Sequence, residues 1–317
     1  MRSLITGGAG FIGREVARSL AARGDGPIAV FSRAPSAARL GDLAAHVTPL
    51  AGDLGSFSHV LDAVRMARPQ IIYHLGALLS VPSEADPATA IQTNAMGTFH
   101  VLEAARLFDV RQVVFASSVG TYGHDLPDQI DDVTLQRPVF LYGATKVFGE
   151  HLGLFYRQKY GLDFRGIRYP AVVGPGVETK GAVQYTSWMI EKPARGEPFT
   201  VWVSPELRTP MMSIGEAARA TVALADAPAE AIKTVTYLVD GMKPTPSAAE
   251  LAAAVRERLP GAQIDFQPNR ALEEKLRGLM RPIDDSRARA EWGWAPSDTP
   301  EMIVEGMLAQ MRAEQPG

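Results

Sequence analysis

Short apolar runs and amphipathic stretches alternate along the first 240 residues. The apolar run over residues 2–6 predicts a buried strand, and apolar side chains at helical spacing over residues 11–23 predict a helix that ends near Gly24. Ser56 is a suitable N-cap for another helix. By the same criteria we expect further strands over residues 28–32, 47–50, 70–75, 112–117 and 234–239, and further helices over residues 89–108, 142–161 and 214–225.

This repeated order of strand and helix predicts an α/β fold, a doubly wound parallel sheet covered by helices on both faces. Beyond Pro170, proline and glycine become frequent and the alternation weakens. We therefore expect a dinucleotide-binding domain over residues 1–170, rejoined by residues 214–240, and a smaller, mixed substrate-binding lobe within residues 171–317. A cleft between two such units is a usual place for an active site.

Three glycines, Gly7, Gly10 and Gly13, lie between the first expected strand and the first expected helix, with Phe11 and Ile12 among them. Glycines spaced in this way let backbone N–H groups at a helix N-terminus approach a pyrophosphate. Tight turns between a strand and a helix also favour glycine, so a purely structural turn is the alternative. Because the motif lies at the first strand–helix junction, we interpret it as a dinucleotide-binding loop.

The residues after the second expected strand bear on the choice between NAD and NADP. NAD-specific sites hold the ribose with an acid at this place, whereas this chain has Ser32 and Arg33. Arg33 can pair with a 2′-phosphate and Ser32 can hydrogen-bond it, which favours NADP over NAD; a solvated surface arginine with NAD-type binding is the alternative. Asp53 and Leu54, at the end of the third expected strand, are placed to reach the adenine, although Asp53 would equally suit a helix cap.

Tyr142 and Lys146 are four residues apart at the start of an expected helix, so their side chains share one face. A free tyrosine, with a pKa of about 10, is a poor base at neutral pH. An adjacent ammonium favours the phenolate, so we expect Lys146 to lower the pKa of Tyr142 and to make proton exchange with an alcohol feasible. The pattern by itself is common, and a half-buried aromatic beside a solvated lysine is the alternative.

A pair of serines ends the fifth expected strand. Ser118 lies 24 residues before Tyr142, and its hydroxyl can hydrogen-bond a substrate oxygen as charge shifts in the transition state, with Ser117 flanking it. A turn or a cap would also explain serines at a strand end. Because the glycine motif, the serines and the Tyr/Lys pair occur together and in this order, we assign Ser118, Tyr142 and Lys146 as one catalytic site.

Composition narrows the possible function classes. The net charge of −3 provides no basic surface for nucleic acid or for an anionic membrane, and no apolar run is long enough to span a bilayer. The absence of cysteine excludes disulfides, thiolate catalysis and cysteine-bound zinc, and the six histidines show no metal-ligand spacing, so we expect no metal. Because the glycine motif follows Met1 so closely, we expect no signal peptide and a cytoplasmic address.

Six short motifs follow one another at residues 7–13 (GGAGFIG), 53–54 (DL), 74–77 (HLGA), 94 with 97–98 (N, GT), 117–118 (SS) and 142–146 (YGATK). Together they resemble the extended short-chain dehydrogenases/reductases, the NAD-dependent epimerase/dehydratase family, over nearly the whole chain. The resemblance implies a Rossmann fold, with Tyr142 as general acid/base, Lys146 as its partner and Ser118 as the third catalytic residue. It also implies a cofactor site that includes Leu75, Gly76, Ala77, Asn94, Ala116, Ser117, Tyr169, Pro170 and Val172, in which the asparagine acts through structure.

Within that family the chain is most similar to the short-chain type of L-threonine 3-dehydrogenases, in residues 74–81, 142–150, 168–170, 209–212 and 283–294. The first of these stretches makes Ser80 a candidate substrate contact beside Ser118. The chain departs from those enzymes in residues 174–185, where only the glycines, a threonine and Tyr185 have counterparts. Thr179 and Tyr185 are therefore candidate contacts to a different small substrate, with an ordinary lid loop as the alternative.

We therefore expect an oxidoreductase that transfers a hydride between nicotinamide and the secondary alcohol or ketone of a small substrate, such as a β-hydroxy acid or an amino acid like threonine. A sugar-nucleotide epimerase or dehydratase that retains its NAD is the first alternative, which the short segment 182–198 and the shifted register of Arg208 disfavour. A cofactor-sensing regulator without catalysis is a more remote alternative. The resemblance also implies a homodimer, paired through the helices expected over residues 89–108 and 142–160.

Overall fold

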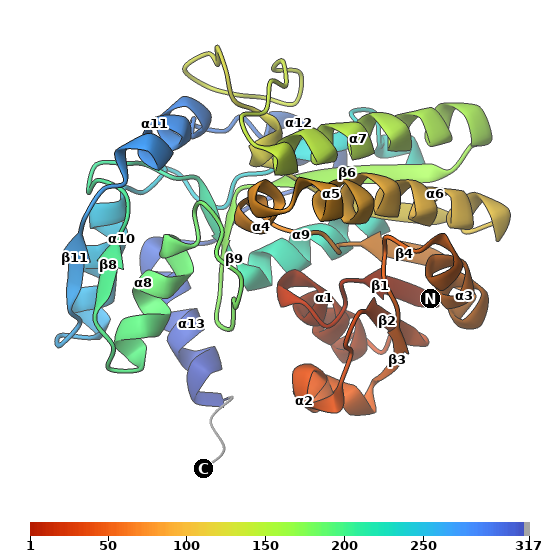
Figure 1. The fold of residues 1–317 in the computed structure, drawn as a ribbon, viewed down its shortest axis with the longest axis horizontal. Coiled ribbons are helices and arrows are strands. Elements are labelled where there is room, and N and C mark those ends of the chain that lie inside the picture. The colour runs from red at the N-terminus through yellow and green to blue at the C-terminus, as the bar shows by residue number, and fades with distance from the viewer. Residues whose placement is uncertain (314–317) are drawn as a thin grey trace.

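The computed structural model describes residues 1–313 and contains a seven-stranded sheet in the order β3-β2-β1-β4-β5-β6-β10 (Figure 1). Every neighbouring pair of these strands is parallel. The predicted doubly wound α/β fold is therefore confirmed. The strands are β1 (Ser3–Thr6), β2 (Ile28–Ser32), β3 (Val47–Ala51), β4 (Ile71–His74), β5 (Gln112–Ser118), β6 (Asp163–Tyr169) and β10 (Thr236–Leu238).

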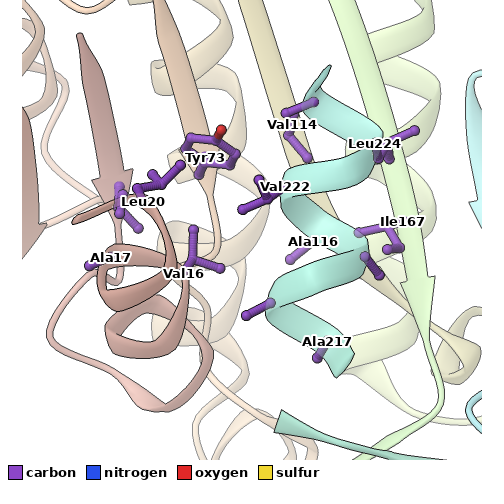
Figure 2. Packing of buried hydrophobic residues seen from close by; sticks show 14 of the residues in the cluster. Val16, Ala17, Leu20, Tyr73, Val114, Ala116, Ile167, Ala217, Val222 and Leu224 are labelled. Carbon is purple, nitrogen blue, oxygen red and sulfur yellow. The ribbon is translucent and has the colours of Figure 1, made fainter. Parts of the chain in front are cut away.

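Helices cover both faces of this sheet, with α3, α6 and α7 on one face and α1 and α9 on the other (Figure 1). Figure 2 shows Tyr73, Val114 and Ile167 from three adjacent strands packed against Val16 of α1 and Val222 of α9. In β4 and β5 the neighbours of these residues, Ile72, Val113 and Phe115, lie in the opposite core, as the pleat requires. No helix within residues 1–313 combines the length and the hydropathy needed to span a membrane. These helices are α1 (Phe11–Ala22), α2 (Ala37–Leu40), α3 (Phe57–Ala67), α4 (Ser80–Ala85), α5 (Pro87–Ala90), α6 (Gly97–Leu107), α7 (Leu141–Tyr160) and α9 (Ile214–Asp226).

The helix expected over residues 89–108 is wrong as one regular element. A π-helical turn, Ile91–Met96, separates α5 from α6. Within this turn the side chain of Asn94 accepts a hydrogen bond from the N–H of Leu78 at 2.8 Å and donates to the carbonyl of the same residue at 3.0 Å. Turns of this kind often mark functional sites. The last expected strand is also shorter than predicted, because Val235 has a positive φ of 69° and the strand begins only after it.

Apolar residues of two segments, 171–211 and 242–311, form a second core, on the left of Figure 1. It supports the predicted substrate lobe, whose boundary at residue 170 stays a prediction. Helix α12 (Ser286–Trp292) departs from this division, because Ala288 and Trp294 pack in the sheet core beside α9. Two small parallel sheets pair β7 (Ala171–Val173) with β9 (Met211–Ser213) and β8 (Phe199–Val201) with β11 (Ile264–Phe266), and the lobe's helices are α8 (Tyr185–Ala194), α10 (Ala248–Arg258), α11 (Arg270–Leu279) and α13 (Pro300–Ala313).

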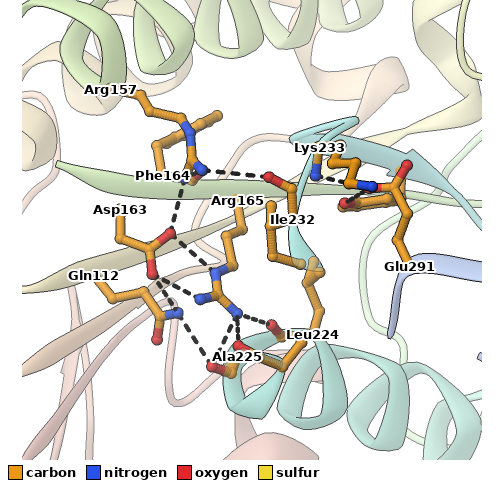
Figure 3. A network of polar contacts seen from close by, with 12 residues as sticks. Gln112, Arg157, Asp163, Phe164, Arg165, Leu224, Ala225, Ile232, Lys233 and Glu291 are labelled. Atoms are coloured by element: carbon orange, nitrogen blue, oxygen red, sulfur yellow. Dashed lines mark hydrogen bonds and ion pairs between the residues drawn. The ribbon is translucent and has the colours of Figure 1, made fainter. Parts of the chain in front are cut away.

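Polar side chains tie the amino ends of β5 and β6 to α9 (Figure 3). The buried guanidinium of Arg165 donates to both carboxylate oxygens of Asp163, at 3.0 and 2.7 Å, and to the carbonyls of Leu224 and Ala227, each at 2.6 Å. Arg157 of α7 donates to the same carboxylate at 3.0 Å. Because these buried charges are paired, the network fixes the end of the sheet opposite to the loops that follow the strands.

Candidate active site

The loops that follow β1 and β4 meet at the carboxyl edge of the sheet. From β1 the strand order runs through β2 to β3 on one side and through β4 to β10 on the other, so this is the topological switch point. Gly7 has a positive φ of 68°, and a Cβ on it would lie 2.7 Å from the Cα of Gly76. The two backbones therefore approach more closely than side chains would allow, at the place where doubly wound folds bind ligands.

Helix α1 begins at this switch point without a capping side chain. Its N-cap residue, Gly10, has no side chain that could cap the helix, and the first turn contains no acid. The N–H of Gly10 donates to the carbonyl of Gly7 at 2.8 Å, and a Cβ on Gly13 would overlap that same oxygen. The N–H groups of the first turn and the positive end of the helix dipole thus stay available, which fits the phosphates of a dinucleotide.

Ser32 and Arg33 lie beside this glycine loop, at the end of β2. The hydroxyl of Ser32 accepts a hydrogen bond from the N–H of Ala9 at 3.1 Å and so ties the two segments together. Arg39, a neighbouring arginine, pairs with Glu178 at 3.0 Å, whereas Arg33 is exposed and takes part in none of the ion pairs within residues 1–313. Among the described residues, Arg33 therefore lies beside the glycine loop without a carboxylate partner.

Asp53 and Leu54 follow β3 at the same edge of the sheet. A carboxylate oxygen of Asp53 accepts a hydrogen bond from the N–H of Gly55 at 2.8 Å, so this side chain shapes the turn before α3. Leu54 is buried, and a Cβ on Gly76 would lie 2.7 Å from its Cδ1. Leu54 thus packs under the loop after β4, and the contact of this pair with adenine stays a prediction.

Asn94 supports the loop after β4, in which the partly exposed residues 75–77 (LGA) lie. Besides its two bonds to Leu78, the buried side-chain amide of Asn94 donates to the hydroxyl of Thr145 on α7 at 3.3 Å. The polar atoms of this amide are therefore engaged by the protein, and they connect the loop to α7. This arrangement agrees with the structural role that the resemblance implies for this asparagine.

Ser118 and Tyr142 are brought together although 24 residues separate them in the sequence. The hydroxyl of Ser118, at the end of β5, lies beside the ring of Tyr142, close enough to lower the pKa of the phenol, and it accepts a hydrogen bond from the N–H of Gly120 at 3.0 Å. Ser117 is turned the other way, is buried and donates to the carboxylate of Glu150. Successive side chains of a strand alternate between faces, so only one of the two serines can reach the tyrosine.

Lys146 is buried close to Tyr142. Its ammonium group donates to the carbonyl of Ala116 at 2.6 Å and lies 4.8 Å from the ring centre of Phe115 and 5.6 Å from that of Tyr142. Burial lowers the pKa of Lys146 from 10.5 to about 7, while the carboxylate of Glu150 acts in the opposite direction. The amine is therefore close to the balance between its charged and neutral forms at neutral pH.

The phenol of Tyr142 is a weaker acid in the chain by itself than we expected from the sequence. Burial raises the pKa of Tyr142 from 10 to about 12, and the contact with Ser118 offsets this only in part. The expectation of a pKa below that of free tyrosine is therefore not met in this structure, because desolvation of the phenol raises the pKa by more than the contact with Ser118 lowers it. Tyr142 therefore holds its proton at neutral pH in this structure.

Residues 169–172 continue from β6 toward the second lobe. The ring of Tyr169 is buried in the sheet core, and its hydroxyl shares a hydrogen bond of 2.5 Å with Thr221 of α9. A cofactor contact of Tyr169 would therefore use its main chain. Val172 is partly buried and packs against the sheet core, and the contacts of Pro170 and Val172 with a cofactor stay predictions.

The predicted substrate residues differ in their exposure and in whether their hydroxyl groups are already hydrogen-bonded. Ser80, the first residue of α4, accepts a hydrogen bond at its hydroxyl from the N–H of Ala182 at 3.2 Å, which joins the loop after β4 to residues 174–185. Thr179 is exposed on that stretch. Tyr185 is buried, and its hydroxyl is already bonded to Thr209 at 2.8 Å, so a substrate contact would require this pair to open.

Two acids near Tyr142 were not singled out from the sequence. Glu84 accepts a hydrogen bond from the N–H of Leu141 at 2.7 Å and so caps the helix that carries Tyr142. Glu150 is buried four residues after Lys146, a spacing that puts both on one helix face and could have identified it. Within residues 1–313, no group of three or more histidine, aspartate or glutamate side chains is arranged to hold a metal ion.

Comparison with known proteins agrees with this geometry. The model of the NAD dependent epimerase/dehydratase family matches residues 3–239. The mitochondrial L-threonine 3-dehydrogenase of Sus scrofa is 32% identical over 255 residues, which are 80% of this chain and 68% of that protein. The holo form of a GalE-like L-threonine dehydrogenase from Cupriavidus necator superposes with a TM-score of 0.90 at 30% identity, covering 98% of this chain and 100% of that one. The UDP-glucose 4-epimerase of Thermus thermophilus in complex with NAD gives 0.84 at 28% identity, covering 99% and 100%.

Proposed function

The chain belongs to the NAD dependent epimerase/dehydratase family, and on that premise we propose that it is a dehydrogenase that oxidises the secondary alcohol of a small β-hydroxy acid or amino acid, such as L-threonine, or reduces the matching ketone. The observation that carries this proposal is the meeting of Ser118, Tyr142 and Lys146 at the carboxyl edge of the sheet, next to the uncapped start of α1. Two of the proteins to which this chain is similar bear the name L-threonine dehydrogenase or L-threonine 3-dehydrogenase.

Each of the three side chains has a separate task in this reaction. The nicotinamide cofactor, when bound, supplies the hydride chemistry. Tyr142 exchanges a proton with the substrate oxygen, and Ser118, which lies beside that phenol, orients the same oxygen. The ammonium of Lys146 stabilises negative charge on the phenol during proton transfer and holds the ribose.

A sugar-nucleotide epimerase or dehydratase is the second candidate, because the family includes such enzymes. Against it, the guanidinium of Arg208 is bound to both carboxylate oxygens of Glu250, at 3.0 and 3.1 Å, and to the carbonyl of Thr245 at 2.5 Å. These bonds turn the guanidinium toward Glu250, and the carboxylate there competes with, and repels, the diphosphate of a sugar nucleotide.

A panel of hydroxy acids, amino acids and sugar derivatives, each with NAD and with NADP, tests this assignment. We expect a net change in the near-ultraviolet absorbance of the nicotinamide with a hydroxy acid or amino acid. A purified protein that keeps its cofactor bound and converts sugar nucleotides with no net absorbance change would establish the second candidate instead. If no substrate in the panel turned over while cofactor still bound, a cofactor-sensing regulator would be the better description.

For the cofactor we propose a preference for NADP over NAD. It is supported by Arg33, which is exposed beside the glycine loop and has no carboxylate partner within residues 1–313. A charge-assisted bond from Arg33 to the 2′-phosphate is worth about 1.5–3 kcal/mol, so Arg33→Ala should raise the KM for NADP roughly tenfold to a hundredfold and leave that for NAD nearly unchanged. Arg111→Ala, at the opposite edge of the sheet, is the control. Equal effects of Arg33→Ala on both cofactors in steady-state assays would contradict the preference.

For the assembly we propose a homodimer through α6 and α7. Large apolar or aromatic side chains on these helices are exposed, among them Leu107 at 50%, Phe148 at 44% and Phe155 at 45%. Covering such side chains in a twofold interface would stabilise a pair. We expect a mass of two chains in light scattering, and of one chain for Phe155→Glu; Met302→Glu, on α13, is the control and should keep the dimer. A wild-type mass of one chain would end this proposal.

The remaining expectations concern the location of the protein in the cell and its binding partners. We propose a cytoplasmic enzyme whose partner is a small molecule rather than nucleic acid or a membrane, which the net charge of −3 supports. Cell fractionation with an antibody to the chain is the measurement, and recovery in the membrane fraction or with nucleic acid would contradict it.

A further inference from the structure

A buried ion pair lies one helical turn beyond Lys146, on the side away from Tyr142 along α7. Glu150, on α7, accepts hydrogen bonds from the Nε and Nη2 of Arg168 at 2.9 and 2.6 Å. The exposed fraction is 5% for Glu150 and 6% for Arg168, so both charges are out of water. The carboxylate also accepts hydrogen bonds from Ser117 and, at 3.0 Å, from Gln136.

The pair touches the strand that carries Ser118. Ser117 immediately precedes Ser118 in β5, and in the β5–β6 register it stands opposite Arg168. The other nitrogen of that guanidinium donates to the hydroxyl of Tyr122 and to the carbonyl of Asp132, each at 2.9 Å. The guanidinium and carboxylate therefore connect α7, β5, β6 and the segment after β5 at one point.

Stability alone does not account for this arrangement. Desolvating two charges offsets most of their attraction, and apolar residues of similar volume often serve as well or better in a core. What a bidentate pair adds is a fixed geometry between the elements that bear it. Here those elements are α7, the helix of Tyr142 and Lys146, and β6, which pairs with the strand end of Ser118.

We propose that Glu150, held by Arg168, is a positioning residue that sets both the location of Ser118 relative to Tyr142 and the charge of Lys146. The carboxylate lies one helical turn beyond Lys146 on the same face, and it fixes the strand end through Ser117. This inference rests on the proposed function, in which a charged Lys146 is the active form.

The charged groups around Lys146 can be named from each element packed against α7. His74 of β4 is held neutral, because burial and Lys146 lower the pKa of His74 to about 3. On the other helices, Glu84 of α4 bonds the N–H of Leu141 and Glu103 of α6 pairs with Arg106, while Asp86 begins α5. Glu150 is thus the carboxylate that acts on Lys146, and it favours the charged amine.

Glu150→Gln tests the proposal, with Asp163→Asn as the matched control. The control removes the carboxylate that pairs with Arg165 near the amino end of β6, the strand that carries Arg168 near its other end (Figure 3). Without the charge of Glu150, the charged form of Lys146 should be lost at lower pH, so the alkaline fall of kcat moves to lower pH. At a pH above the alkaline fall of the variant, we expect its kcat to be about tenfold below that of the wild type, with KM changed less than about twofold. Asp163→Asn should leave the pH profile in place.

A second measurement keeps the test independent of turnover. The chain has seven lysines, so side-chain NMR of labelled lysine can follow Lys146, assigned by loss of its signal in Lys146→Met. Glu150→Gln should titrate Lys146 at lower pH than the wild type. Because an unpaired Arg168 costs stability, Glu150→Gln with Arg168→Met serves if the single variant does not fold, and it should show the same direction.

The outcomes separate the two proposals. If Lys146 titrates at lower pH in the variant but no substrate of the panel is turned over by the wild type, the proposed function fails and the effect of Glu150 on the lysine stands. If the wild type is active and neither the pH profile nor the titration of Lys146 differs in Glu150→Gln, the positioning role is overturned while the function holds. Equal profile changes in Asp163→Asn would also overturn it.

Discussion

Replacing Tyr142 with phenylalanine is expected to lower kcat by about 10²–10⁴-fold, the range that a positioned acid or base contributes. The substitution removes the group that exchanges the proton and keeps the ring that packs near Lys146. Cofactor affinity should change little, because the glycine loop at the start of α1 is untouched. Stopped-flow or steady-state absorbance with the best substrate of the panel, together with a cofactor titration, measures both quantities.

Tyr160→Phe is the control, because Tyr160 lies exposed at the far end of the same helix. It should turn over like the wild type. The assignment of Tyr142 would be refuted by a Tyr142→Phe enzyme that kept full kcat on the identified substrate. Loss of cofactor binding together with kcat would point instead to a displaced loop.

Replacing Lys146 with methionine is expected to abolish turnover and, at the same time, to stabilise the cofactor-free protein below neutral pH. Burial lowers the pKa of Lys146 from 10.5 to about 7, so the charged amine is less favourable in the folded chain than in the unfolded one. The stabilisation should be on the order of 3 kcal/mol, reduced by the lost bond to the carbonyl of Ala116.

The pH dependence of this gain has a definite sign. Below about pH 7 the amine is charged in both the folded and the unfolded chain, so the wild type bears the whole cost of the buried charge. Between pH 7 and pH 10.5 the unfolded chain binds the proton and the folded chain does not, so wild-type stability rises with pH and the advantage of methionine shrinks. Denaturant unfolding at a series of pH values measures it.

Lys159→Met is the matched control, because Lys159 is exposed on the last turn of the same helix and should show no such pH-dependent gain. A Lys146→Met protein that was less stable than the wild type at every pH would contradict an amine held in the core against a desolvation cost. An unchanged kcat would separately exclude Lys146 from the reaction.

Local features of the sequence were sufficient to predict the sheet and most of its elements. Apolar runs and helical spacing are properties of a few neighbouring residues, which is why α1, β2 and α9 lie within a residue or so of their expected bounds. The junction at Gly7 is equally local, because a positive φ at a strand end favours a residue without a side chain. Tyr142 and Lys146 share a helix, and their spacing alone puts them on one face.

Tertiary structure decided what depends on segments distant in the chain. Asn94 bonds to Leu78 from a π-helical turn within a segment whose periodicity predicts one regular helix. Tyr185, which the sequence suggested for substrate, is buried and paired with Thr209. Only burial determines that the pKa of Tyr142 rises although a lysine lies nearby.

The sequence by itself therefore determined the fold class, the position of the glycine loop and the identity of the Tyr/Lys pair, because each depends on residues within a few positions of one another. Tertiary structure decided how Ser118 meets Tyr142, which side chains hold Glu150, and in which direction the pKa values of Tyr142 and Lys146 shift. Those properties depend on the pleat of β5, the register of β5 with β6 and the exclusion of water, and a linear pattern encodes none of them.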